Sequence, residues 1–131
     1  GGLSSMNNPY EEIYQKIMEL SKAKGYATFD YLPDDEQGYP FVFVGEQDNT
    51  DQYTKGRTLG STDIQVHVYA EFDHRSDVTA IMNDLLAVVV SNHETPHFRY
   101  QVVNSTSKML GDQSTGIDLW HGLLTLTIQY L

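Results

Sequence analysis

One pair of histidines in this sequence has a spacing that suits metal binding. His93 and His97 stand four residues apart, and on a helix this spacing places two imidazoles around one zinc ion. Pro96 interrupts such a helix, and no third ligand lies nearby in the sequence. The chain also has no cysteine, which removes thiolate zinc sites, disulfides and cysteine nucleophiles together. We therefore expect no metal at this pair.

Carboxylates cluster most densely at Asp34, Asp35 and Glu36, and such oxygens are the ligands that Ca²⁺ and Mg²⁺ prefer. The cluster lies between Pro33 and Gly38 and lacks the spaced ligands of a calcium loop. A solvated turn is the expected interpretation.

Motifs of catalysis and nucleotide binding are missing from the sequence. No serine lies in a G-x-S-x-G elbow, and there is neither a P-loop nor a dinucleotide fingerprint. The basic residues Lys55, Arg57, Arg75 and Arg99 are too sparse for a nucleic-acid patch. We expect a protein that is not an enzyme and that holds no cofactor and no metal.

The elements that position these residues follow from hydrophobic periodicity. Asn8 and Pro9 begin an amphipathic helix, and Gly25 ends it. A second helix begins at Ser76 or Asp77 and ends before Pro96. Strands are expected at 26–32, 39–46, 62–72, 98–103 and 117–131. The order α-β-β-β-α-β-β predicts an α+β fold, with about five mostly antiparallel strands and both helices on one face.

The third of these strands alternates strictly, so that one of its faces is core and the other is exposed or at an interface. His67 and Tyr69 lie on the outward face, and His121 lies on the outward face of the last strand. The two histidines can approach each other across the sheet. Leu119 and Leu123 would leave an apolar patch on a monomer, which favours oligomerisation.

Two polar segments, 47–60 and 104–116, have almost nothing to bury, and we expect both to be long loops. Long loops of small domains often bind partners. The candidate contact residues in them are Thr54, Lys55, Arg57 and Lys108.

Composition bounds the class of protein. The chain has 131 residues, 40% of them hydrophobic, which fits one domain with an ordinary core. We interpret residues 1–5 as an expression scar and 6–131 as a single domain. The net charge of −10 argues against wrapping of nucleic acid. It favours solubility, or repulsion of a polyanion that passes nearby. We expect neither a membrane segment nor a signal peptide.

Several segments, in this order, resemble the small tail-terminator (tail-completion) proteins of long-tailed phages and prophages of Gram-positive bacteria. They are Tyr39-Pro-Phe-Val-Phe-Val-Gly-Glu46, Thr54-Lys55, Ile64-Gln-Val-His-Val-Tyr69 and Leu119-Trp-His-Gly-Leu-Leu-Thr-Leu126. In those relatives the third strand commonly ends in His-Val-Trp, and Tyr69 stands at the Trp position here.

The resemblance implies a homo-oligomeric ring, usually a hexamer, that caps the tail tube and offers a surface to the head connector. Its partners would be the major tail-tube protein and a connector or neck protein. DNA would pass the lumen without specific binding. Such a protein lies in the virion tail and is assembled in the host cytoplasm. Two alternatives stay open: another neck or head-completion protein on a similar scaffold, and a small ligand-binding or enzymatic α+β domain.

Overall fold

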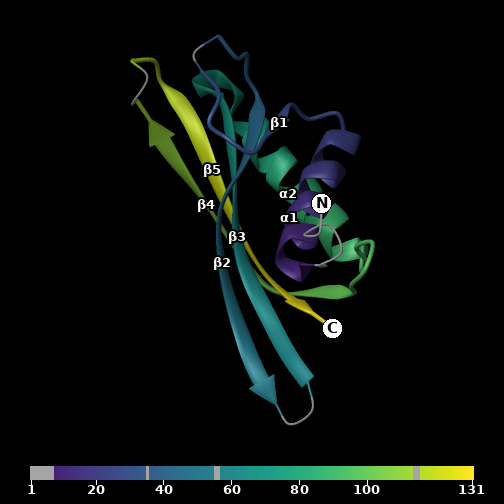
Figure 1. Cartoon of the computed structure of the whole chain (residues 1–131). Helices are drawn as coiled ribbons and strands as arrows, with labels where there is room; N and C mark the ends of the chain where they lie inside the picture. The colour runs from purple at the N-terminus through teal and green to yellow at the C-terminus, as the bar shows by residue number, and fades with distance from the viewer. Residues whose placement is uncertain (1–7, 35, 55–56, 114–115) are drawn as a thin grey trace.

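The computed structural model describes residues 8–34, 36–54, 57–113 and 116–131. It has two α-helices, a short 3-10 helix and one five-stranded sheet. In chain order the elements are α1 (Pro9–Ala23), β1 (Thr28–Phe29), β2 (Phe41–Thr54), β3 (Arg57–Glu71), η2 (Phe72–His74), α2 (Arg75–Ser91), β4 (Tyr100–Asp112) and β5 (Leu119–Tyr130). This is the predicted α+β order, and Figure 1 shows both helices on the same side of the sheet.

Helix α1 begins and ends where the sequence predicts. The Asn8 side chain accepts hydrogen bonds from the backbone N–H groups of Tyr10 and Glu11, and Pro9 occupies the first turn. The cap satisfies amide donors that have no partner inside the helix. After the helix, Gly25 adopts a φ of 92°, a left-handed conformation that favours glycine.

Helix α2 differs from the prediction at its start. Its N-cap residue is His74, whose side chain makes no capping hydrogen bond, so the predicted caps Ser76 and Asp77 lie inside the first turn. The reason is that η2 continues directly from β3 and winds the chain into the helix before those residues. Trp120 holds this junction, since its Nε1 donates to the Phe72 carbonyl at 2.9 Å and its ring stacks on that of Phe72.

The sheet order is β1-β2-β3-β5-β4, and every pairing except β1 with β2 is antiparallel. The predicted strand at 26–32 is much shorter in the structure. Only Thr28 and Phe29 pair, with Val42 and Phe43, because the chain then turns away from the edge of β2.

The two polar segments predicted as loops are strands, and that prediction was wrong. Residues 47–54 continue β2 and pair with 57–64 of β3, after a bulge between Val44 and Gln47. Residues 104–112 continue β4 and pair with β5, after a bulge between Val102 and Asn104. Backbone hydrogen bonds hold these exposed halves, so they need no apolar side chains. Figure 1 shows the β2–β3 hairpin extending well beyond the helices.

The core lies between the helices and the face of the sheet they cover. It contains Ile13 and Ile17 of α1, Leu85 and Val89 of α2, and the inward residues of the strands. Those inward residues alternate as predicted, and they include Val66 and Val68 of β3 and Leu124, Leu126 and Ile128 of β5.

Gly122 marks the closest approach of α2 to the sheet. A Cβ at this position would lie 2.8 Å from Met82 Sδ and closer still to Val78 Cγ1. We expect Gly122→Ala to lower the free energy of unfolding by about 2 kcal/mol, because α2 must move to admit the methyl group. Urea unfolding measures this loss.

Gly111, on the adjacent strand β4, provides the matched control. A Cβ there meets no atom within 4 Å, so Gly111→Ala should leave stability almost unchanged. Equal stabilities of the two variants would contradict the close packing of α2 on β5.

Candidate functional site

The face of the sheet away from the helices carries a ladder of rings. We define the ring ladder as Phe41, Phe43, His67, Tyr69 and His121, which come from β2, β3 and β5. Adjacent rings stack, with centroids 5.0 Å apart for Phe41 and Tyr69, 5.2 Å for Phe43 and His67, and 4.3 Å for Tyr69 and His121. Neither helix covers this face (Figure 1), on which Phe43, Tyr69 and His121 are half-buried while Phe41 and His67 are buried.

Two histidines at the centre of the ladder are hydrogen-bonded to each other, as the sequence allowed. His67 Nδ1 lies 2.7 Å from His121 Nε2, and His67 Nε2 lies 3.1 Å from a carboxylate oxygen of Glu46. When His67 is neutral and its Nε2–H donates to Glu46, its Nδ1 accepts a hydrogen bond from the Nε2–H of His121. The bond between the rings needs at least one neutral imidazole, so the pair holds at most one extra proton while it stays intact.

The lowered pKa of His121 makes the free energy of unfolding depend on pH. Burial lowers the pKa of this imidazole and His67 lowers it further, while Asp112 and Glu46 act in the opposite direction. A histidine with a lowered pKa stabilises the fold in its neutral form. Stability is therefore lost as pH falls from the unfolded-chain pKa, about 6.5, toward the lower pKa of the folded chain.

We expect the free energy of unfolding to fall between about pH 7.5 and pH 5.5, and to fall less in His121→Gln, which removes the titrating ring. Chemical denaturation at each pH measures both slopes. His74→Gln is the control, because His74 is exposed and lies away from the ladder. Identical slopes for wild type and His121→Gln would contradict this assignment.

The predicted contact residues divide between this face and the tip of the hairpin. The uncovered face brings together His67, Tyr69, His121, Leu123 and Lys108, and Leu123 pairs with both His67 and Lys108. Whether these residues touch a partner stays a prediction. Lys55 lies outside the described residues, and Thr54 and Arg57 are described only as a backbone pair that ends the β2–β3 ladder.

Leu119 corrects one part of the expected patch. Only 2% of its surface is exposed, so it is not the exposed apolar residue that strand alternation predicts. It lies at the start of β5 opposite Glu71, and it lines a surface hollow together with Tyr39, Phe72 and Ile117. Alternation places a side chain on a face, but only tertiary packing decides whether that face is covered.

Phe41 and Phe43 are not among the predicted contact residues, because a continuously apolar run such as 41–44 is typical either of burial on both faces or of an outward face covered by a partner. Phe43 is half-buried and stacks on His67. The sequence does not distinguish the inward from the outward face of this strand, since all four residues of the run are apolar.

The projecting β2–β3 hairpin is held at its base by Tyr10 of α1. The Tyr10 hydroxyl donates to the Asp51 carboxylate, and Gln47 Nε2 donates to the Tyr10 carbonyl at 2.9 Å. Gly60 pairs with Tyr130, and of the β3 residues paired with β5 it lies nearest the hairpin tip. Between Gly60 and the tip, the described residues of β2 and β3 pair only with each other. Tyr53, near the end of β2, is 81% exposed.

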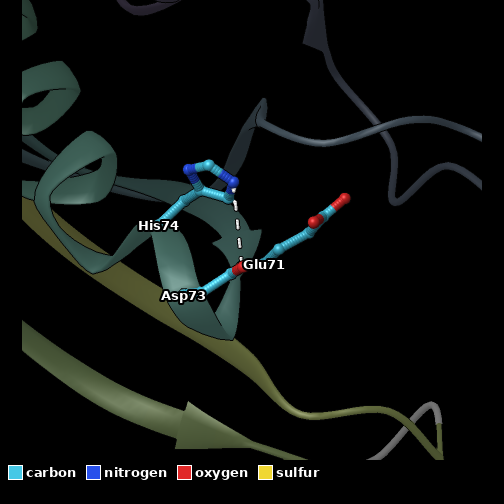
Figure 2. A group of neighbouring side chains, drawn as sticks. All are labelled: Glu71, Asp73 and His74. Carbon is cyan, nitrogen blue, oxygen red and sulfur yellow. Dashed lines mark ion pairs between the residues drawn. The ribbon is translucent and has the colours of Figure 1, made fainter.

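A carboxylate and histidine group at the end of β3 is the described cluster that comes closest to metal-ligand geometry. Figure 2 shows Glu71, Asp73 and His74 near one another, with His74 Nε2 3.7 Å from an Asp73 oxygen. All three are exposed, and His74 also lies 3.5 Å from Asp77. Exposed groups of this kind are typical of solvated turns, and we assign no ion to it.

His97, one of the pair with possible zinc spacing, instead fixes a loop to α1. Its backbone N–H donates to one oxygen of Glu12 at 2.8 Å, and its Nδ1 lies 2.9 Å from the other. Thr95 donates to the same carboxylate at 3.0 Å. Burial raises the pKa of Glu12, but the bonds from His97 and Thr95 outweigh it, and the pKa lies below its usual range. This role of Glu12 is structural.

Comparisons with known proteins give a fold relationship. No protein-family model and no curated protein matches this sequence. Among solved structures, the fold is similar to that of a chain from the virion of a native gene transfer agent particle. The match has a TM-score of 0.59 and 15% sequence identity, and it covers 93% of this chain and 93% of that chain. The match therefore spans the whole α+β architecture and is not limited to one hairpin.

Proposed function

We propose that this chain is a structural subunit of a phage-like virion, and that within the virion it is a tail terminator. The observation that carries the proposal is the fold match over almost the full length of both chains to a virion chain. It agrees with the resemblance of four sequence segments, in the same order, to tail-terminator proteins.

The surfaces support a protein that works by docking. The half-buried rings of Phe43, Tyr69 and His121, the projecting hairpin and the exposed strand β4 all lie outside the core cluster and present surface to partners. In the described part of the chain, every buried side-chain nitrogen and oxygen has a hydrogen-bond partner.

In this role the chain forms a ring, usually a hexamer, that caps the tail tube, ends its growth and presents a surface to the head connector. The ring belongs to the virion tail and is assembled in the host cytoplasm. The excess of 18 acidic over 8 basic residues suits a ring through which DNA passes without binding. In the described residues no helix is both long enough and apolar enough to span a bilayer.

Native mass spectrometry and a tube-growth assay test the proposal. We expect a closed ring, alone or on purified tail-tube protein, and we expect added chain to stop tube elongation. Pull-down with tube protein, compared with connector protein, separates a terminator from another neck protein. A chain that stays monomeric with both partners and leaves tube length unchanged would overturn the proposal.

A further inference from the structure

The sheet leaves both of its long edges without a partner. On the outer side of β2, β1 pairs only with Val42 and Phe43, so no described strand pairs with the edge from Val44 to Thr54, where the hydroxyls of Tyr14 and Tyr10 donate to the carbonyls of Val44 and Thr50. At the other end of the sheet, β4 pairs with β5 alone over Tyr100–Asp112. Most residues of both segments are exposed. Free edges of this length offer unpaired backbone donors and acceptors to another strand.

The directions of the two edges suit each other. Strand β2 is antiparallel to β3, β3 to β5, and β5 to β4, so β2 and β4 run in opposite directions. Consider a second copy that is related to the first by a rotation about an axis parallel to the strands. Each of its strands then runs in the same direction as the equivalent strand of the first copy. Its β2 would then meet β4 of the first copy in antiparallel pairing. Such a contact joins two different edges, and repeated rotation closes it into a ring.

The charges on the two edges favour pairing of β2 with β4 over pairing of β2 with β2 or of β4 with β4. The free edge of β2 carries Glu46, Asp48 and Asp51, and β2 has no basic residue. The centre of β4 carries Lys108. Lys108 and Asp48 lie on the same uncovered face of the sheet, because their register partners Leu123 and Asp63 do. Neither makes an ion pair with a described residue of its own chain.

Pairing β2 with β2 would bring carboxylates together, and pairing β4 with β4 would bring two Lys108 ammonium groups together. Like charges across an interface weaken binding, so both symmetric contacts are disfavoured. The bulges at residues 45–46 and 103 also interrupt any longer symmetric register.

We propose that copies of this chain join head to tail, with the β4 edge of one copy adding antiparallel to the β2 edge of the next, and with Lys108 facing Asp48 of that β2. This inference rests on the proposed ring function and names the surface through which the ring is built.

Cysteine cross-linking tests the contact directly, since the chain contains no cysteine. Thr106 of β4 and Thr50 of β2 point to the uncovered face, because they pair with Thr125 and Ser61. A short flexible bismaleimide applied to the double variant Thr106→Cys, Thr50→Cys should give a ladder of covalent oligomers. Each single variant should stay a monomer on a denaturing gel, because head-to-tail contacts join two different edges.

The control places the second cysteine on a helix instead of β2. Thr106→Cys with Glu19→Cys, which is exposed on α1, should give no ladder. Dimers from Thr106→Cys alone would instead indicate β4–β4 pairing and would overturn the proposal.

Charge reversal supplies a second readout. We expect Lys108→Glu and Asp48→Lys each to weaken self-association at least about tenfold, and the double variant to recover most of that loss. Analytical ultracentrifugation measures the dissociation constant for self-association of each of the three variants. Loss in the single variants without recovery in the double variant would count against the pairing.

The two proposals fail in different ways. Native mass spectrometry could detect a wild-type ring while the cysteine variants give no β4–β2 cross-link. This result would contradict the edge contact but not the terminator proposal. A chain that never oligomerises, with or without tube protein, sinks both.

Discussion

Replacing Leu126 with alanine is expected to lower the free energy of unfolding by about 3 kcal/mol. Leu126 is fully buried in the core cluster, on the central part of β5 opposite Ile64. Truncation removes the transfer free energy of the lost carbons and leaves a cavity that the surrounding strands fill only in part. Urea unfolding, with the denaturant slope held constant, measures the loss.

Leu123, in the same strand, provides the matched control. It lies on the uncovered face beside His67 and Lys108 and is partly exposed. Leu123→Ala should cost less than Leu126→Ala, by about 1 kcal/mol or more, because Leu123 is only half-buried and its truncation leaves no closed cavity. If Leu123→Ala were as destabilising as Leu126→Ala, another part of the chain would have to cover this face.

Shortening the β2–β3 hairpin is expected to abolish assembly while leaving the fold intact. The proposed variant replaces residues 52–59 with Asn-Gly, which joins Asp51 to Gly60. These two residues already face each other across the ladder, so a two-residue turn fits between them. The Tyr10–Asp51 contact that anchors the base of the hairpin is retained. The described strand residues of the removed segment pair only with each other, within the hairpin.

We expect cooperative unfolding close to that of wild type, and at least a tenfold loss of ring formation or tube capping if the hairpin contacts a partner. Calorimetry and the tube-growth assay measure the two effects. Tyr53→Ala, which keeps the length of the hairpin, separates the contribution of its exposed aromatic ring. A shortened variant that assembles normally would remove the hairpin from the functional surface. A variant that loses cooperative unfolding would show that the hairpin supports the fold.

The predicted and observed strands differ most where side chains carry no information about pairing. Residues 47–54 and 104–112 are polar, and a strand exposed on both faces has no hydrophobic alternation to reveal it. Residues 104–112 pair with β5, which the sequence analysis did assign, whereas 51–54 pair with 57–60, which lie in the same predicted loop. Pairing between strands is a tertiary property, and local propensity constrains it weakly.

The candidate surface was predicted in part. Alternation placed His67, Tyr69, His121 and Leu123 on one face because the side-chain period of a strand is two. That period could not reveal that Leu119 is buried.

What the sequence determined by itself was the order of elements, the helix cap at Asn8 and the inward residues of the sheet, because these depend on local hydrogen bonding and on hydrophobic period. The tertiary structure decided the short distance between His67 and His121, the length of the projecting hairpin and the two free edges. These features depend on which strands lie side by side and in which register. Pairing between residues far apart in the sequence, such as Gly60 with Tyr130, sets that register.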